Sequence, residues 1–259
     1  MESRPNIMPW LLLAASCSPA EFVWQQPVPE HLARYRRAFD DAVGDTVEAT
    51  CSPKELLAAV DDARVLWLGD HHRSTRLHAL HGNLLEQLAR SPRRVVLVLE
   101  ALGVQDQRDV DAFLDDRLTL QELTDRCLQR WAGSWLDDRD LDPWYYRSLC
   151  TTARRHGWRL VGLEPTPRPP LARRDAAMAS RLAALAASDP QALVVVVVGQ
   201  AHLLGEGDLV RRTGLPAVAL GGEPPPALAA RSPRGQGRLV RSGGGLWWFA
   251  ELFGGEPVR

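Results

Sequence analysis

The sequence lacks several features that would place it in a familiar class. Its 259 residues contain 4 cysteines and no CxxC pair, which argues against a zinc ribbon, a thioredoxin-type motif or a disulfide scaffold. No apolar run reaches the roughly 18 residues that a membrane-spanning helix needs. Lys54 is the only lysine, and a net charge of -1 leaves no basic excess for nucleic acid. We therefore expect neither a transmembrane span nor a nucleic-acid partner.

Common enzyme motifs are also missing. The chain contains no GxGxxG or GxxxxGK frame for a nucleotide, no GxSxG elbow and no HExxH zinc motif. What it does contain is ordinary for a globular protein: 45% hydrophobic and 24% charged residues, enough to build a sizeable core. A serine hydrolase of the common kind is therefore not expected.

The N-terminus permits two interpretations. A short apolar segment from Ile7 leads into Ala14-Ala15-Ser16-Cys17, which resembles a bacterial lipoprotein signal with Cys17 as the lipidated residue. Pro9 interrupts that segment, and Glu2 offsets the positive charge that precedes it. Both features favour a loosely packed tail instead. The first interpretation predicts a cell-envelope lipoprotein, and the second predicts a cytoplasmic protein. In either case we expect residues 1–30 to be a tail or signal with a linker, and residues 31–259 to form one domain.

After residue 30 the chain alternates between helical patterns and short apolar runs. Helices are predicted over 31–43, 53–62, 76–90, 105–114, 118–130, 175–187 and a segment ending near 156–157. Buried strands are predicted over 64–69, 94–100, 159–163, 192–199 and 216–221. Continuous apolar strands separated by helices predict an α/β fold with a central, mostly parallel sheet and helices on both faces. Residues 238–241 and 246–249, joined by a glycine-rich loop, predict a C-terminal antiparallel hairpin.

Acidic and histidine residues gather where the predicted parallel strands end. Ligands of open α/β sheets bind beyond the carboxyl ends of the strands, so these positions form the candidate site. The positions are Asp70, His71, His72, Glu100, Glu164 and His202. Imidazoles and carboxylates together can hold a divalent metal ion or perform acid–base chemistry, and histidine can also ligate haem iron.

Each of these residues also has a structural interpretation. His81 falls on the apolar face of its predicted helix and is expected in the core, while His78 lies at the edge of that face. Glu100 has many arginines available for an ion pair, and Glu164 precedes a proline and could close a turn. We favour a functional site because all four predicted strand ends carry acidic or histidine residues.

An aromatic stretch follows the second predicted strand. It predicts either a wall over a flat ligand, with Tyr145 or Tyr146 as an iron ligand, or a set of packing anchors between helices. Its members are Trp131, Trp135, Trp144, Tyr145 and Tyr146.

Taken together, these motifs resemble the ChaN-like haem-binding uptake family, which belongs with the Tiki and erythromycin-esterase-like proteins. Gly69-Asp70-His71-His72 with His78 resembles the GExHxxxxxH signature, and Gly199-Gln200-Ala201-His202 resembles the second GxxH motif of Tiki-type members. Glu100 matches an acid at a strand end. Further matches are Trp131, Tyr145 or Tyr146, Ala153, Gly157, Leu160–Leu163 and Pro167-Arg168. The resemblance spans residues 55–220.

The resemblance implies more than one activity. ChaN-like members are regarded as iron-regulated lipoproteins that bind haem through His or Tyr, Tiki-type members as metal-dependent proteases, and the esterase-like members as lactone hydrolases. Two positions depart from the pattern: Asp70 replaces the usual Glu, and Glu164 replaces an Asn found in many ChaN-like members. The acid-rich site that results weakens the transfer of haem binding and makes a metal site more plausible.

Two functional hypotheses follow. The first is a haem- or iron-binding protein of bacterial haem or iron uptake, with the candidate ligands His72, His78, His202, Tyr145 and Tyr146. The second is a metal-dependent hydrolase with a divalent ion on His72, His202, Asp70 and Glu100, in which Glu100 or Glu164 is the catalytic base. A site that has lost its activity remains a third alternative. Whether a second subunit completes the pocket, as in a homodimer, is left open.

Overall fold

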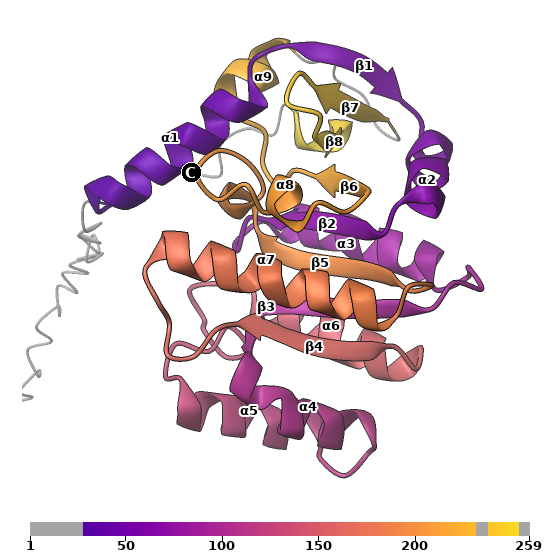
Figure 1. Ribbon diagram of the computed structural model, residues 1–259, viewed down its shortest axis with the longest axis vertical. Coiled ribbons are helices and arrows are strands. Elements are labelled where there is room, and N and C mark those ends of the chain that lie inside the picture. Colours follow the sequence, from indigo (N-terminus) through magenta and orange to yellow (C-terminus); the bar gives the residue numbers. More distant parts are fainter. Residues whose placement is uncertain (1–27, 232–237, 254–259) are drawn as a thin grey trace, which may run out of the picture.

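A single eight-stranded sheet organises the computed structural model, which describes residues 28–231 and 238–253 (Figure 1). Its strand order is β1-β7-β8-β6-β2-β5-β3-β4. The strands are β1 (Val47–Cys51), β2 (Val65–Asp70), β3 (Val95–Gly103), β4 (Arg159–Glu164), β5 (Leu193–Gly199), β6 (Ala217–Leu220), β7 (Leu239–Ser242) and β8 (Trp247–Phe249).

The parallel part of the sheet consists of β6, β2, β5, β3 and β4. Nearly every residue in β2, β3 and β5 is buried, as expected for strands covered on both faces. The prediction of a mostly parallel sheet is therefore confirmed. The strand predicted to end at Glu100 continues to Gly103, with a register shift against β4 between Leu99 and Gly103.

The other part of the sheet is formed by the two ends of the described chain. β7 and β8 pair antiparallel, which confirms the predicted hairpin, and β8 joins the parallel part through Leu220 and Trp247. Outside β7 lies β1, which pairs with it antiparallel. No strand was expected at β1, whose sequence VEATC is short, and only its last residue, Cys51, is buried.

Nine helices in the described ranges cover the two faces of the sheet (Figure 1). α2 and α5 begin with capping boxes, in which Ser52 and Thr119 exchange hydrogen bonds with Glu55 and Glu122. The helices are α1 (Glu30–Val43), α2 (Pro53–Asp62), α3 (Thr75–Leu88), α4 (Gln107–Leu114), α5 (Leu120–Arg130), α6 (Pro143–Arg155), α7 (Leu171–Ser188), α8 (Leu209–Thr213) and α9 (Pro226–Arg231).

The core lies in two layers, one on each side of the sheet. Leu66 and Leu97 face the layer that contains α2, α3, α4, α5 and α6. Their neighbours Trp67 and Val96 face the opposite layer, which contains α1, α7, α8 and α9. This alternation is what a strand with buried residues on both faces requires. The predicted α/β fold with helices on both faces is confirmed.

The N-terminal predictions fall largely outside the described part of the chain. Cys17 and the apolar segment before it lie outside the described residues. The three described cysteines, Cys51, Cys127 and Cys150, are buried free thiols, as expected of small core residues. None of the described helices is long and apolar enough to cross a membrane.

Candidate functional site

A cavity of about 710 Å³ opens at the carboxyl ends of β2, β3 and β5. We call it the cleft. Asp70, His72, Glu100 and His202 all line it, so the structure brings together the residues that the sequence placed at three separate strand ends. Glu164, which ends β4, does not line the cleft.

Asp70 anchors one side of the cleft from the last position of β2. Its carboxylate is buried, and its Oδ2 accepts a hydrogen bond from the Tyr146 hydroxyl at 2.6 Å and lies 2.9 Å from His72 Nδ1. Burial favours a raised pKa, but hydrogen bonds from His72 and His78 outweigh it and hold the pKa of Asp70 below its ordinary value. Asp70 is therefore an ionised group that orients the His72 ring.

His72 is the cleft histidine with an accessible ring nitrogen. Nδ1 is taken by Asp70 and Tyr146, whereas no described residue forms a hydrogen bond with Nε2. The His72 side chain is 34% exposed and packs against Trp135, with the ring centroids 4.3 Å apart. A histidine oriented at Nδ1 by a carboxylate presents Nε2 as a ligand or a base.

His78 is held between two carboxylates and is not free to bind a ligand. Its Nε2 lies 2.9 Å from Asp70 Oδ1, and its Nδ1 lies 2.8 Å from Asp142 Oδ2. His78 as a whole is 5% exposed, and its ring stacks on that of Tyr145. Burial opposes its charge, but Asp70 and Asp142 together raise the pKa of His78 above its ordinary value.

Tyr145 and Tyr146 lie behind the cleft wall. The Tyr145 hydroxyl is 2.8 Å from His81 Nδ1, and neither tyrosine lines the cleft. Both side chains belong to the core. His81 is fully buried, as the helix pattern predicted, and burial lowers its pKa to about 4. As placed, the two tyrosines serve to orient histidines.

Arg174 binds the two glutamates on the opposite side. It makes an ion pair with Glu100 and another with Glu164 at 2.9 Å, and all three side chains are buried. Burial favours the neutral form of Glu100, but His202 and Arg174 lower its pKa below the ordinary value. Glu164 differs, because burial outweighs its arginine partners and raises its pKa.

His202 lies next to this ion-pair cluster, with each ring nitrogen facing an acid. Its Nδ1 is 2.6 Å from Asp175 Oδ1 and its Nε2 is 3.5 Å from Glu100 Oε1. Tyr35, from α1, donates its hydroxyl to Asp175 and contacts His202 Nδ1. Burial opposes the charge of His202, but Glu100 and Asp175 raise its pKa to about 9.

The two sides of the cleft meet at Gly199, the last residue of β5. A Cβ added there would lie 3.5 Å from Glu100 Oε2, 3.5 Å from His202 Cδ2 and 3.6 Å from His72 Cε1. The Gly199 amide also donates to Glu100 Oε2. Both histidines and one carboxylate therefore surround a single backbone position.

The carboxylates predicted to bind a divalent metal ion already have other partners. Asp70 already receives three hydrogen bonds, and Glu100 is neutralised by Arg174. Within residues 28–231 and 238–253, no group of three or more His, Cys, Asp or Glu side chains is arranged to hold a metal ion. As they lie, these residues do not fit such an ion, and the metal set stays a prediction.

Sequence reasoning missed three residues of the site. Tyr35 lies on α1, far from the other site residues in sequence, while Arg174 and Asp175 lie within α7. No local pattern marks them, since arginine and aspartate are abundant throughout the chain. Trp135, which belonged to the noted aromatic stretch, does line the cleft, whereas Trp144 is 75% exposed.

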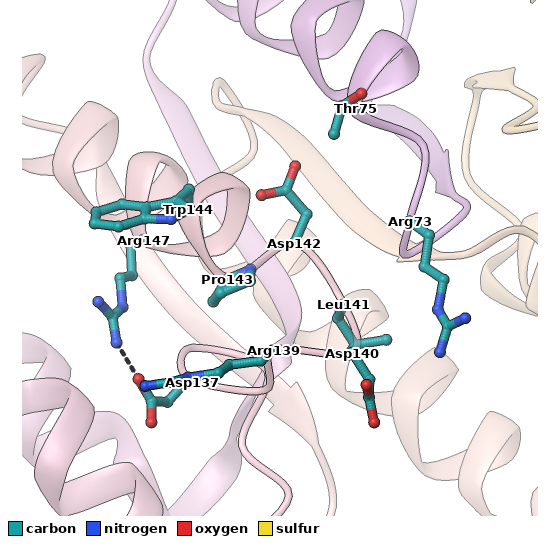
Figure 2. A pocket seen from close by; sticks show the side chains of 10 residues that line it. All are labelled: Arg73, Thr75, Asp137, Arg139, Asp140, Leu141, Asp142, Pro143, Trp144 and Arg147. Carbon is teal, nitrogen blue, oxygen red and sulfur yellow. Dashed lines mark hydrogen bonds and ion pairs between the residues drawn. The ribbon is translucent and has the colours of Figure 1, made fainter. Parts of the chain in front are cut away.

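A second cavity, of about 830 Å³, adjoins the cleft (Figure 2). We call it the outer pocket. It shares Arg73 and Leu141 with the cleft, and Asp142, the partner of His78, lines it at the start of α6. In Figure 2 the Asp142 carboxylate turns away from Asp137 and Arg139.

Comparison with known proteins finds a family match for part of the chain. Residues 56–169 match the sequence model described as haem-binding uptake, Tiki superfamily, ChaN. The match includes Asp70, His72, His78 and Glu100, and it ends before Arg174 and His202. No match is found among curated proteins.

Several solved structures are similar to this chain at low sequence identity. The type III effector HopBA1 is 14% identical with a TM-score of 0.50, over 79% of this chain and 96% of that chain. ChaN of Campylobacter jejuni, described with cofacial heme binding, is 13% identical with a TM-score of 0.47, over 65% and 84%. The effector domain RRSP of a MARTX toxin from Vibrio vulnificus is 20% identical with a TM-score of 0.43, over 74% and 39%.

The similarity to HopBA1 concerns the fold alone, whereas the family match rests on the sequence itself. The resemblance seen in the sequence is thereby confirmed for the segment that carries Asp70, His72 and Glu100: residues 56–169 match the ChaN family of haem-binding uptake proteins in the Tiki superfamily.

Proposed function

We propose that this protein binds haem in the cleft, with His72 as a ligand to the iron. The observation that carries the proposal is the state of the His72 ring. Asp70 and Tyr146 hold its Nδ1, and its Nε2 is left without a partner among the described residues that line the cleft. A carboxylate behind the ring raises the basicity of the imidazole and fixes its orientation, which is the usual arrangement for a metal-bound histidine.

The cleft walls also suit a flat molecule with an apolar body and acidic groups. Phe39, Trp135 and Leu171 supply apolar surface, while Arg36 and Arg168 supply positive charge. Haem combines an apolar macrocycle with two carboxylates, and arginine pairs with carboxylates through two parallel hydrogen bonds. The volume of about 710 Å³ lies in the usual range for small-molecule sites.

His202 is the second candidate ligand. It lines the cleft, but Asp175 holds its Nδ1 and its Nε2 faces Glu100. Binding through Nε2 would require the ring to lose its proton and its attraction to Glu100. His78, Tyr145 and Tyr146 are hydrogen-bonded and buried, so in this proposal they support His72 instead of touching iron.

Haem is the cargo in this proposal, and the chain's own residues bind and orient it. His72 would offer Nε2 to the iron, Trp135 would supply apolar surface to the macrocycle, and Arg36 and Arg168 would pair with the acidic groups. The cellular role that follows is haem or iron uptake in a bacterium. A lipid on Cys17 would place the protein at the cell envelope, and Cys17→Ala would then move it from the membrane fraction to the soluble fraction.

A haem titration tests the proposal directly. We expect saturable binding with a Soret band that shifts as the haem is bound, and at least a tenfold loss of affinity in His72→Ala. His31→Ala, an exposed histidine on α1, is the matched control and should bind haem as the wild type does. Equal affinity in the His72→Ala protein would overturn His72 as the ligand, and the absence of saturable binding to wild type would overturn the function.

The predicted metal-dependent hydrolase remains a second candidate because His72, Glu100 and His202 converge on Gly199. It requires Glu100 to leave Arg174 and bind the ion, and Glu164, which lies behind Arg174, to reach the cleft. Elemental analysis of purified protein and chelator-sensitive hydrolysis test this alternative. Stoichiometric zinc, manganese or iron without a Soret band would favour it, and a metal-free, fully folded protein would count against it.

A further inference from the structure

Asp142 connects the outer pocket to the interior. It is the N-cap of α6, where its Oδ1 accepts a hydrogen bond from the Tyr145 amide at 3.2 Å. Its other oxygen, Oδ2, lies 2.8 Å from His78 Nδ1. The side chain is 18% exposed and lines the outer pocket (Figure 2). One carboxylate therefore serves both as a helix cap and as a histidine partner.

His78 transmits this contact to Asp70. A carboxylate oxygen accepts hydrogen bonds, so a ring with Asp142 on one nitrogen and Asp70 on the other donates from both. Its flat stacking on Tyr145, with centroids 3.8 Å apart and planes 3° apart, prevents the ring from rotating away. His78 therefore presents a fixed donor, its Nε2–H group, to Asp70 Oδ1.

Asp70 completes a continuous chain to the cleft. Its Oδ1 accepts from His78 Nε2, while its Oδ2 is shared by the Tyr146 hydroxyl and His72 Nδ1. The chain Asp142–His78–Asp70–His72 runs from the outer pocket to the cleft with each side-chain contact between 2.8 and 2.9 Å. Neither Asp142 nor His78 lines the cleft.

We propose that Asp142 is a positioning residue for His72, acting through His78 and Asp70 to keep the His72 proton on Nδ1 and its Nε2 lone pair in the cleft. The identity of the ligand that binds His72 Nε2 rests on the proposed haem function. The inference about the tautomer of His72 does not.

The physical reason is the direction of the hydrogen-bond donors between Asp142 and His72. The Asp142 carboxylate accepts from His78 Nδ1, and this contact holds the ring with Nε2 directed at Asp70 Oδ1. An amide at position 142 can present either its oxygen or its NH₂ group to His78 Nδ1, so it no longer fixes this direction. Asp70 Oδ1 then loses a fixed donor, and the carboxylate can turn away from the orientation in which Oδ2 meets His72 Nδ1. With Asp70 Oδ2 no longer held opposite His72 Nδ1, the Nδ1 proton loses its fixed acceptor, and His72 samples both tautomers.

The chain offers a matched pair of variants. Asp142→Asn retains an N-cap side chain, so α6 should still form, while it removes the charge. Asp140→Asn makes the same change two residues earlier in the outer pocket, at an exposed aspartate whose carboxylate has no hydrogen bond or ion pair with a described residue. If Asp142→Asn does not fold, Asp142→Ser keeps a capping hydroxyl that is too short to reach His78.

The decisive measurement is the ring-nitrogen NMR spectrum of His72 in the full, haem-free chain at pH 7. We expect the wild type and Asp140→Asn to show a protonated Nδ1 and an unprotonated Nε2, and Asp142→Asn to show exchange between the tautomers. In haem titrations Asp142→Asn should weaken binding about tenfold, the lower end of the usual effect of residues behind a ligand. Asp142→Glu, which keeps the charge, should restore part of that loss.

Unchanged His72 nitrogen shifts in Asp142→Asn would overturn the inference, as would an equal change in Asp140→Asn. If the wild type fails to bind haem, the proposed function fails, but the nitrogen shifts still decide whether Asp142 controls the tautomer.

Discussion

At the scale of single residues, the groups around His202 make the stability of the protein depend on pH. Its pKa is raised to about 9, so it is charged in the folded protein at neutral pH, whereas an exposed histidine titrates near 6.5. This contribution to stability is complete below pH 6.5 and is lost as the pH rises through 9. We expect the free energy of unfolding to fall between pH 6.5 and 9, and this fall to shrink in His202→Gln. Urea denaturation at several pH values measures both slopes.

Arg174 provides a second test at this scale. Its removal would leave Glu100 and Glu164 buried without their cation, and breaking a buried ion pair in this way costs about 3–5 kcal/mol. Arg174→Met should therefore lower the free energy of unfolding by that amount. Arg94→Met, which breaks an exposed pair with Asp189, should cost no more than about 1 kcal/mol. Similar losses in the two variants, measured by chemical denaturation, would contradict the assignment.

The residues of the site were predictable only in part, for a physical reason. Asp70, His72, Glu100 and His202 could be found because strand ends bring residues together at a known edge of a parallel sheet. Arg174 and Asp175 could not, because their partners are set by how α7 packs on the sheet, and no local pattern records that packing. The sequence also gave no sign that His78 would be enclosed by two acids, since Asp142 lies in a different segment of the chain.

At the scale of elements, the pairing of β3 with β4 depends on one glycine. A Cβ at Gly162 would lie 2.2 Å from the carbonyl oxygen of Gly103, where the register between the two strands shifts. Because backbone atoms cannot move aside cheaply, Gly162→Ala should cost about 3 kcal/mol.

Gly82→Ala is the matched control for this change. A Cβ at Gly82, inside α3, would meet nothing within 4 Å, and alanine favours helices by about 0.5–1 kcal/mol over glycine. Gly82→Ala should therefore raise the thermal midpoint while Gly162→Ala lowers it. A neutral Gly162→Ala would show that the two strands can separate locally.

At the scale of the whole molecule, the strand order predicts a gradient of protection. β2 and β5 lie inside the sheet, with paired strands on both sides and buried residues on both faces, whereas β1 is an edge strand with partly exposed side chains. Amide hydrogens of β2 and β5 should exchange at the rate of global unfolding, and those of β1 faster. Hydrogen exchange read by mass spectrometry distinguishes this gradient from uniform opening.

The parallel half of this architecture was predictable because runs such as residues 192–199 are apolar without a break and suit burial on both faces. The placement of β1 was not. Its pairing with β7 joins segments from opposite ends of the described chain, and such a contact leaves no periodic trace in either one.

The contact between β1 and β7 also affects the order in which the protein folds during its synthesis. During synthesis, β1 emerges early from the ribosome, but its partner follows only after all five parallel strands have been translated. In the same way, Tyr35 can form its contacts with Asp175 and His202 only after those later residues have been translated. The nascent chain can therefore assemble most of its parallel sheet before the first strand is paired, and closure of the site is among the last events of folding, because contacts distant in sequence form slowly.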